Sequence, residues 1–208
     1  MLIYSANFGS FDKNIEWEKQ DAEIIRLDDS TCPPRLAALT PRLYSKLIKC
    51  FGWQMFPRRD IYIWADASFK FLTGATEWLL DELGDADIAV VKHPWRNTIK
   101  AEYETLLADN YKPYVNKRYG TELIEQQYAV IKNDPFYTDD SLFCGGLIIY
   151  RPVPLVQSMF KEWWYHISRY HLDDQLSLPY VIKNSGCDYK VIQADIYKLP
   201  LIPHMRKS

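Results

Sequence analysis

The sequence predicts an α/β layered fold with a largely parallel central sheet. Three observations support this prediction: short apolar runs alternate with helical stretches, the runs are rich in β-branched residues, and turn residues separate them. Parallel neighbours in a sheet need crossover helices, so this alternation is typical of such a sheet. A chain of 208 residues can bury a core without disulfides or metals, and we expect one domain over residues 1–208.

The first half of the chain is expected to contribute four strands and two helices. Apolar runs of strand length, bounded by turn residues, predict strands over 2–6, 22–27, 60–66 and 86–92. The segments "RLYSKLIKCF" (42–51) and "TEWLLDEL" (76–83) repeat apolar residues at helical spacing. Both are therefore predicted as helices.

The second half continues the alternation with longer helices. Helical spacing predicts helices over 98–109, 114–131, 154–170 and 173–186. The runs "GGLIIYR" (145–151) and "DYKVIQA" (188–194) are predicted as strands, and the second closes the sheet. Asp134-Pro135 marks a turn in the loop before the first of these strands, and Gly186 is expected to end the last helix.

Composition and charge exclude several classes of protein. A formal net charge of −2 argues against a general nucleic-acid-binding protein, which normally has a basic face. The chain shows neither a signal-peptide pattern nor a run of about 18 apolar residues. Its mildly basic tail, "HMRKS", permits contact with the anionic inner face of a membrane without arguing for it. The cysteines are far apart and form no C-x-x-C pair, which fits a reducing cytoplasm better than a zinc site or disulfides: Cys32, Cys50, Cys144 and Cys187.

Asp66 ends the apolar run "DIYIWAD" (60–66). A carboxylate at the end of a buried strand is costly unless a cation or a hydrogen-bond donor meets it. Ligands of parallel α/β sheets gather at the carboxyl ends of strands, where a carboxylate can hold a divalent cation or a ribose hydroxyl. The alternative is that Asp66 caps the turn after the strand. This stretch leaves the two interpretations about equal.

Two further patterns carry polar or glycine residues into the predicted sheet edge. Gly145 and Gly146 begin a buried strand, where the missing Cβ lets a ligand or another backbone approach closely; a tight turn or bulge is the more common explanation. Asp173, Asp174 and Gln175 begin a predicted helix. Helix capping accounts for one of these carboxylates, and the second, with the amide, could orient the hydroxyls of a sugar.

Paired cations and a late histidine complete the candidates. Arg96 and Lys100 lie at i, i+4 near a helix start, a spacing suited to an anionic group, although a solvated basic face is the commoner explanation. Arg42 and Lys46 form a similar pair before the Asp66 strand. His204, in a proline-bounded tail that also carries Lys207, could reach back over a site; a disordered terminus is the alternative.

The order of these patterns resembles that of GT-A glycosyltransferases, which use nucleotide-sugar donors. More closely, the chain is similar to the glycosyltransferase-like domain family of plant mucilage-related proteins and bacterial polysaccharide loci, and distantly to glycogenin-like glycosyltransferases. The resemblance runs from residue 3 to about 182, and these pieces carry it: "IYSANFGSFD", "RLYSKLIKC", "IYIWADAS", "HPWRNTIKAEYE", "GGLIIYR" and "WWYHISRYHLDDQLSLPYV".

The resemblance implies a GT-A-like three-layer α/β/α fold and a donor site at the carboxyl edge of its sheet. Asp66 would stand in the D-x-D position, which binds metal and ribose, and His204 in the place of a C-terminal metal-ligating histidine. Asp174 and Gln175 would match an acidic-Gln pair near the transferred sugar. The remaining positions would border the base and ribose, face the donor or line the sugar pocket: Ser5, Ala6, Asn7, Gly9, Arg42, Lys46, Gly145 and Gly146.

The sequence departs from the D-x-D pattern at Ser68, where the second carboxylate would stand. A hydroxyl is a weaker ligand for Mn²⁺ or Mg²⁺, so a metal held by Asp66 and His204 would lose an anionic ligand. Without metal, the leaving diphosphate would need other cations, and four basic residues are candidates for this role: Lys46, Arg96, Lys100 and Lys207.

The resemblance implies transfer of a hexosyl group from a UDP- or GDP-linked sugar to a glycan in polysaccharide biosynthesis, in the cytoplasm or at the inner face of its membrane. An inverting enzyme would use Asp174 or Asp173 as base, whereas a retaining enzyme would place Asp174 or Gln175 opposite the leaving group. The residues do not decide between them, and the glycogenin-like similarity favours retention.

Two other functions compete with this one. A phosphatase of the haloacid-dehalogenase kind also uses Asp at a strand end, but it carries its D-x-D on the first strand, where this chain has "IYSAN". A non-catalytic carbohydrate- or nucleotide-binding domain of the same fold fits the aromatic content and the altered D-x-D. The sequence names neither the donor nor the acceptor, nor the oligomeric state.

Overall fold

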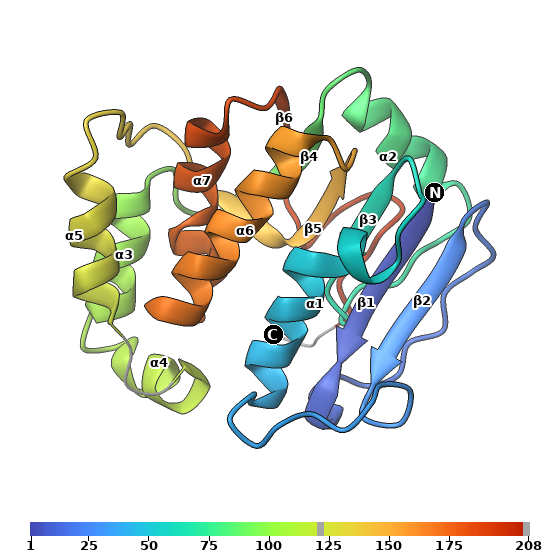
Figure 1. Cartoon of the computed structure of the whole chain (residues 1–208), viewed down its shortest axis with the longest axis horizontal. Helices are drawn as coiled ribbons and strands as arrows, with labels where there is room; N and C mark the ends of the chain where they lie inside the picture. Colours follow the sequence, from blue (N-terminus) through green and yellow to red (C-terminus); the bar gives the residue numbers. More distant parts are fainter. Residues whose placement is uncertain (120–122, 206–208) are drawn as a thin grey trace.

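A computed structural model describes residues 1–119 and 123–205 of the chain. Its strands form one sheet in the order β2-β1-β3-β5-β4-β6 (Figure 1). The strands of this sheet are β1 Leu2–Asn7, β2 Glu23–Asp28, β3 Tyr62–Ala65, β4 Ile88–Lys92, β5 Phe143–Tyr150 and β6 Tyr189–Ile192. The helices and 3-10 turns are η1 Phe8–Ser10, α1 Pro41–Met55, α2 Ala75–Leu83, α3 Ile99–Leu107, α4 Lys112–Tyr119, α5 Ile124–Lys132, α6 Pro154–Arg169, η2 Asp174–Leu176 and α7 Leu178–Ser185.

The sheet is mostly parallel, as predicted, and β5 is the strand that runs the other way. Strand β1 pairs in parallel with β2 and β3, and β4 pairs in parallel with β6. Strand β5 lies antiparallel between β3 and β4. Its first residues, which include Gly145 and Gly146, therefore lie at the edge where the other strands end. The backbone N–H of Asp66 donates to the carbonyl of Gly146 there, at 2.8 Å.

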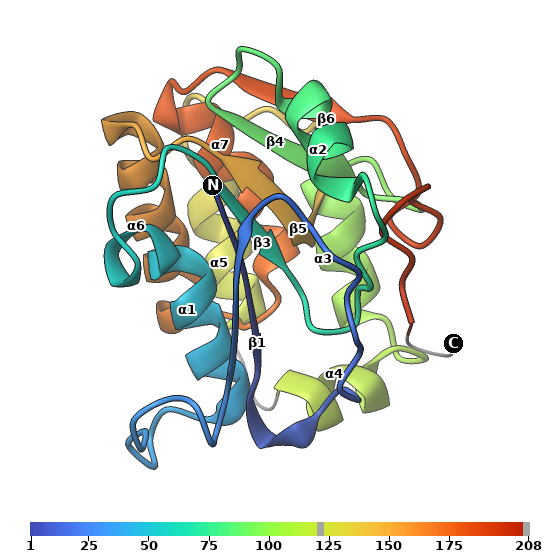
Figure 2. The ribbon, with the colours of Figure 1, turned by 90° about the vertical axis from the view of Figure 1, so that its right-hand side faces the viewer.

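Helices cover both faces of the sheet, which confirms the predicted three-layer α/β/α architecture. Helices α1, α6 and α7 pack on one face, and α2 packs on the other with the segments that follow β3 and β6. Figure 2 views the sheet from its β2 edge, with α1 and α6 on one side and α2 on the other. Helices α3, α4 and α5 enclose a smaller apolar cluster near the start of β5, which includes Leu142.

The alternation of side chains along β1 shows how the two faces are built. Leu2 and Tyr4 point to the α1 face and Ile3 to the α2 face, and all three are fully buried. Gly52 of α1 lies over the Tyr4 ring, where a Cβ would come within 2.3 Å of a ring carbon. The glycine lets α1 lie directly on β1, and the Tyr4 hydroxyl donates to the carbonyl of Lys49 at 2.8 Å.

Helix ends differ from the sequence prediction where capping and proline decide them. Helix α1 begins one residue before the predicted start, where Thr40 caps it through the N–H of Leu43 and Pro41 fits its first turn, and it continues to Met55, four residues beyond the predicted end. The predicted helix 173–186 begins instead as the turn η2, and α7 starts at Leu178, since proline at position 179 favours a first turn. Gly186 ends α7 with φ +72°, as predicted.

The predicted helix 114–131 corresponds to two described helices, α4 and α5, and α5 begins after Leu123, whose backbone angles are not helical. Helix α5 packs against α3 with the buried side chains of Ile124 and Ile131. Among the residues that the structure describes, no helix combines the length and hydrophobicity needed to cross a bilayer.

Candidate functional site

A cleft opens at the sheet edge where β1 and β3 end. Its empty space measures about 630 Å³ with the open mouth included. Residues from β1, the following loop, α1 and the end of β3 line it, among them Asn7, Phe11, Arg42, Lys46, Lys49 and Asp66. A second hollow shares Asn7 and Ala67 with this cleft and extends to Ser5, Arg26 and Asp28 at the ends of β1 and β2.

The loop after β1 is folded tightly onto the start of α1. The Asn7 amide donates to the Asp12 carbonyl at 2.7 Å and accepts from the Asp12 N–H at 3.0 Å. Gly9 has φ +71°, and its N–H donates to Asp29 at 2.6 Å. Because a Cβ at Gly9 would lie 3.2 Å from Pro41, both the backbone angle and the space favour glycine. The polar end of β1 thus has a defined shape beside the cleft.

Three cations of α1 face this edge at the spacing of one helix face. Arg42, Lys46 and Lys49 follow each other at i, i+4 and i+7. The Arg42 guanidinium lies 4.8 Å from the centre of the Phe11 ring, on the wall of the cleft. The two lysines reach deeper, toward the strand ends.

Asp66 is met by an indole and an ammonium. The Nε1–H of Trp64 donates to Asp66 Oδ1 at 3.0 Å, and Lys49 Nζ lies 3.3 Å from the same oxygen. The Asp66 side chain nevertheless remains 43% exposed. The carboxylate is therefore held at one oxygen on the cleft wall and remains accessible to a ligand.

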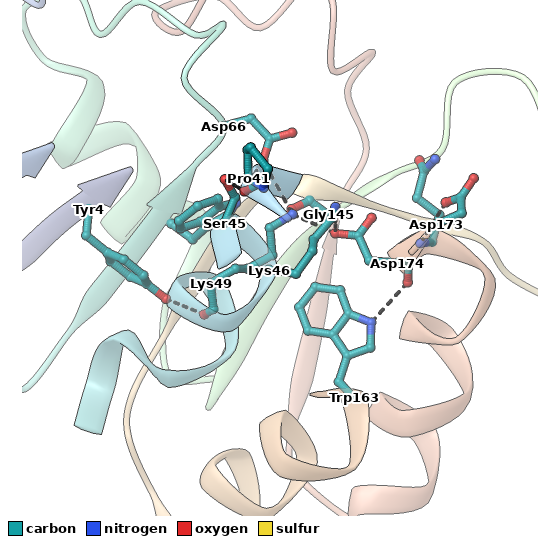
Figure 3. Close-up of polar contacts among 12 residues, drawn as sticks. Tyr4, Pro41, Ser45, Lys46, Lys49, Asp66, Gly145, Trp163, Asp173 and Asp174 are labelled. Atoms are coloured by element: carbon teal, nitrogen blue, oxygen red, sulfur yellow. Dashed lines mark hydrogen bonds and ion pairs between the residues drawn. The ribbon is translucent and has the colours of Figure 1, made fainter. Parts of the chain in front are cut away.

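Lys49 is the centre of the polar network (Figure 3). Its Nζ donates to the Gly145 carbonyl at 2.7 Å and to Asp174 Oδ2 at 2.6 Å, in addition to the Asp66 contact. Its side chain is only 1% exposed. Burial opposes the charge, but Asp174 and Asp66 outweigh burial, and the pKa of Lys49 is raised. Lys49 is a permanent buried cation.

Asp174 is paired with two lysines. Lys46 Nζ lies 2.5 Å from the same Oδ2 that Lys49 contacts, and the Asp174 side chain is 8% exposed. Burial would raise the pKa of Asp174, but Lys46 and Lys49 together hold it well below its usual range. The pKa of Lys46 is lowered because burial outweighs the attraction of Asp174. Lys46 and Lys49 share Asp174, and Lys49 also contacts Asp66, so two ammonium groups and two carboxylates form one connected network beside the cleft.

The paired glycines are needed because side chains approach the start of β5. A Cβ at Gly145 would lie 2.9 Å from Asp174 Oδ2, and one at Gly146 would lie 3.2 Å from the Phe69 ring and 3.4 Å from Asp66 Oδ2. Asp174 is held in place from below, since Trp163 Nε1–H donates to its carbonyl at 3.0 Å (Figure 3). The lack of side chains at Gly145 and Gly146 therefore lets the Asp174 and Asp66 carboxylates lie close to the start of β5.

Arg96 belongs to a separate buried cluster. It pairs with Glu102 of α3, and one of its NH groups lies 3.2 Å from His93 Nε2. Burial, and then the charge of Asp173, raise the pKa of Glu102 to about 7 against the opposing effect of Arg96. With its raised pKa, Glu102 retains a proton to higher pH than an isolated carboxyl group does.

The chain after β6 returns to this edge and pairs with the segment after β3. The Met205 N–H donates to the Ser68 carbonyl at 2.7 Å, and the Lys70 N–H donates to the Pro203 carbonyl at 3.0 Å. Ser68 is buried under this pairing, at 3% exposure. The His204 ring packs edge-on against Phe69, with ring centres 5.1 Å apart. The tail therefore packs over Ser68, which occupies the position of the second carboxylate in the D-x-D pattern.

The residues predicted as metal ligands do not form a metal site in this arrangement. Within 1–119 and 123–205, no three His, Cys, Asp or Glu side chains are grouped so that they could hold a metal ion. Lys49 contacts the Asp66 carboxylate, Ser68 is buried, and His204 contacts aromatic rings. The donor set does not fit Mn²⁺ or Mg²⁺, whose sites in proteins are built from several oxygen ligands.

An exposed aromatic pair lies at the same edge, beyond β4. Trp95 and Tyr197 are stacked with ring centres 5.3 Å apart and planes 18° from parallel. Trp95 remains 67% exposed and Tyr197 44% exposed. Tyr197 in turn contacts His204 edge-on, and His204 contacts Phe69, so a continuous row of rings leads toward Gly146 and the cleft.

The structure brings together part of the predicted set. Around the cleft and the Lys49 network lie Ala6, Asn7, Arg42, Lys46, Asp66, Gly145, Gly146 and Asp174, with Ser5 in the adjoining hollow. Gln175 is half-buried, and its N–H donates to Asp173. Lys100 lies 3.7 Å from Glu104 on exposed α3 surface, and Lys207 is outside the described residues.

Sequence reasoning missed Lys49 and Glu102. Lys49 is the second lysine of "RLYSKLIKCF" and falls on the helix face of Arg42 and Lys46. A charge at that spacing within an otherwise apolar helix face was an available signal. Nothing in the sequence distinguishes the buried Glu102 from the exposed Glu104 that follows it by two positions.

Solved structures that resemble this fold are glycosyltransferases. A glycosyltransferase involved in the glycosylation of the major capsid of PBCV-1 aligns with a TM-score of 0.50 and 11% identity, over 100% of this chain and 94% of that one. Mouse xyloside xylosyltransferase 1 aligns with a TM-score of 0.44 and 13% identity, over 82% of this chain; the chain spans 63% of the mouse protein. The galactosyltransferase LgtC aligns with a TM-score of 0.38 and 12% identity, over 92% and 73% of the two chains.

No protein-family model and no curated protein matches the sequence. At such low identities the likeness is one of fold, and the PBCV-1 enzyme aligns over the full length of this chain. The chain adopts a GT-A-like three-layer α/β/α fold with a mostly parallel central sheet.

Proposed function

We propose that the protein is a glycosyltransferase that moves a sugar from a nucleotide-diphosphate donor to a glycan. One observation carries this proposal: the buried lysine pair and Arg42 face a cleft at the carboxyl ends of β1 and β3, opposite the exposed carboxylate of Asp66. The guanidinium and ammonium donors on the cleft wall suit the oxygens of a diphosphate, and a carboxylate beside them suits a ribose or sugar hydroxyl. The fold and the sequence resemblance to polysaccharide-locus proteins support the same function.

We propose the following placement of the donor. The nucleoside lies in the hollow beside Asn7 and the ends of β1 and β2, and the diphosphate extends over Arg42 and Lys46. The transferred sugar lies toward Gly145 and Gln175. The adjoining cleft and hollow support this placement because they share Asn7 and Ala67 and together offer space for both halves of a donor.

The proposed reaction is displacement at the anomeric carbon. The bond from that carbon to the phosphate oxygen breaks with its electron pair going to the diphosphate, and the acceptor oxygen forms the new bond. Cations near the diphosphate stabilise the charge that develops on it. We favour hexosyl transfer with retention, in which the proton of the acceptor hydroxyl leaves with the phosphate, because the lowered pKa of Asp174 makes it a weak base.

We further propose that the acceptor glycan rests on Trp95 and Tyr197. Sugar rings present apolar C–H faces that pack on flat aromatic surfaces, and this pair is stacked and exposed. The row of rings from Tyr197 through His204 to the buried Phe69 links the platform to the start of β5, near the proposed sugar position. A polysaccharide or surface glycan would be long enough to contact the Trp95–Tyr197 platform and reach the proposed sugar position at the same time.

Nucleotide binding and sugar transfer test the proposal in sequence. UDP and GDP, each at a few millimolar, are expected to raise the melting temperature of the protein, and Arg42→Ala is expected to reduce that shift. Lys132→Ala, on exposed α5, is the matched control and should retain the full shift. Incubation with a panel of UDP- and GDP-sugars should then release nucleoside diphosphate.

The outcomes separate the two candidate functions. If neither nucleotide stabilises the protein, the proposal is wrong. If a nucleotide binds but no sugar donor is hydrolysed or transferred with any glycan tried, the protein is a non-catalytic nucleotide- or carbohydrate-binding domain of the same fold.

A further inference from the structure

We propose that the ammonium group of Lys49 is the resident cation of this site and stands where a divalent metal would otherwise be held. The three oxygens around Lys49 Nζ come from three elements: Asp66 at the end of β3, the Gly145 carbonyl in β5, and Asp174 in η2, at 3.3, 2.7 and 2.6 Å. Two carboxylates and a carbonyl converging on one point are the oxygen types that hard divalent cations bind.

The ammonium groups of Lys49 and Lys46 together match the charge of the two carboxylates. An ammonium has three N–H donors and no acceptor: Lys49 Nζ donates hydrogen bonds to the Gly145 carbonyl and Asp174 Oδ2, and Asp66 Oδ1 lies at ion-pair distance. Lys49 is 1% exposed, so these contacts replace water entirely. The favourable pairing keeps Lys49 charged despite its burial. Unlike a metal ion, this cation is covalently attached and does not exchange with solvent.

A divalent metal and the Lys49 ammonium would compete for the same oxygens. Bound to Asp66 and Asp174, a metal would lie within a few Å of the ammonium, and repulsion between like charges at such a distance is strong where water is excluded. Ser68 carries a hydroxyl and offers no compensating carboxylate, and it is buried beneath the pairing with Met205. Ser68 in the D-x-D position and the Lys49 ammonium therefore both disfavour a bound metal.

Lys46 differs from Lys49 in a way that divides their roles. Lys46 pairs with Asp174, is 16% exposed and lines the cleft next to Arg42. Lys49 joins the two carboxylates and is 1% exposed, so Lys46 is the lysine whose charge lies nearer the cleft. If the proposed function holds, Lys46 and Arg42 face the diphosphate, and Lys49 fixes Asp66 and Asp174 without a metal.

The test uses Mn²⁺ as the probe and needs no nucleotide for its central measurement. Electron paramagnetic resonance should detect no stoichiometric Mn²⁺ on the wild-type protein. Lys49→Ala removes the ammonium and leaves room between the three oxygens, so this variant should bind one Mn²⁺ per chain and gain melting temperature from it. Lys49→Met fills the same space without charge and should bind no Mn²⁺, which makes it the matched control.

Each result bears on the proposal. Stoichiometric, micromolar Mn²⁺ binding by the wild type that Asp66→Asn abolishes would overturn it, as would a folded Lys49→Ala that binds no more Mn²⁺ than Lys49→Met. If Lys49→Ala does not fold in either the presence or the absence of Mn²⁺, the wild-type measurement decides.

Nucleotide binding forms a separate arm. Wild-type affinity for UDP or GDP should change less than twofold between excess EDTA and excess Mn²⁺, and a tenfold or greater dependence on Mn²⁺ would contradict metal-independent binding. If no nucleotide binds at all while Lys49→Ala gains Mn²⁺, the proposed function fails and the assignment of Lys49 stands.

Discussion

Two carboxylates at one edge of the sheet contact the same lysine, and their surroundings differ sharply. Asp174, in the turn η2, is 8% exposed and lies 2.5 and 2.6 Å from the ammonium groups of Lys46 and Lys49. Asp66, at the end of β3, is 43% exposed and lies 3.3 Å from Lys49 alone. Burial makes the Asp174 carboxylate an internal counter-ion, whereas exposure leaves the Asp66 carboxylate available to a ligand.

This difference assigns structural and ligand-binding work to different residues. A buried ion pair is strongly coupled to stability, because removal of one partner leaves an uncompensated charge in the interior. A pair at the rim is screened by water and contributes little. We therefore expect substitutions at Asp174 to act mainly on folding and substitutions at Asp66 mainly on binding.

The largest effect is expected at Asp174. Asp174→Asn leaves the two buried ammonium groups without their shared counter-ion and should lower the free energy of unfolding by about 3–5 kcal/mol. Urea unfolding monitored by fluorescence measures this loss. A double variant that also carries Lys46→Met should recover part of it, because one of the unpaired charges is then removed; a loss below 1 kcal/mol would refute the network.

Glu102 should give the free energy of unfolding a pH dependence opposite to the one that Asp174 gives it. The pKa of Glu102 is raised to about 7 from its ordinary 4.5, so the folded protein retains a proton that the unfolded chain releases. Its contribution is complete below pH 4.5 and is lost as the pH rises through about 7, a change of up to about 3 kcal/mol. Asp174, whose pKa is lowered, contributes above its ordinary pKa and loses its contribution in stronger acid.

Unfolding free energies at several pH values between 4.5 and 8 test this prediction. Glu102→Gln should flatten the profile across that range. Glu104→Gln, two positions along the same helix and exposed, should leave it unchanged. Parallel profiles for the wild type and Glu102→Gln would show that another group titrates.

The two glycines of β5 lie beside the same two carboxylates, Gly145 next to Asp174 and Gly146 next to Asp66. Gly145→Ala would place a Cβ 2.9 Å from Asp174 Oδ2 and should cost about 1–3 kcal/mol of stability, since the buried carboxylate cannot move away. Gly146→Ala meets the Phe69 ring at 3.2 Å and Asp66 at 3.4 Å, and should cost less. Thermal unfolding of both variants measures the difference, and the reverse order would contradict the comparison.

A smaller effect is expected on acceptor binding. Trp95→Ala removes half of the exposed stack and should weaken glycan binding about tenfold, or about 1.4 kcal/mol, without changing the thermal shift produced by a nucleotide. Phe136, another exposed aromatic residue, supplies the control variant Phe136→Ala. Titration of the wild type with oligosaccharides, followed by fluorescence, gives the reference; equal affinities for all three proteins would exclude this platform.

The smallest effect on stability is expected at Asp66. Asp66→Asn removes a half-exposed partner of Lys49 and should change the free energy of unfolding by about 1 kcal/mol or less. The same variant should lose the stabilisation produced by UDP or GDP, because the exposed carboxylate no longer contacts the ligand. A stability loss as large as that of Asp174→Asn would show that the two carboxylates do not differ in role.

Local patterns were sufficient for the elements and for part of the site. Alternation along β1 and helical spacing along α1 follow from nearest neighbours in the chain, and both were predicted to within a few residues. Asp66 was recognised as a candidate because a charge ends a buried run. Helix ends were less accurate, since Thr40 and Pro179 decide them through individual hydrogen bonds and steric limits.

The sequence by itself determined the layered α/β class, the order of its elements and the strand-end carboxylate, because each depends on residues close together in the chain. Only the tertiary structure decided that β5 runs antiparallel and that Lys49 joins Asp66 to Asp174. The contacts of Lys49 with Gly145 and Asp174 span 96 and 125 residues of sequence. A lysine is buried only where oxygens from several elements converge, and the packing of α1, β5 and η2 determines that convergence.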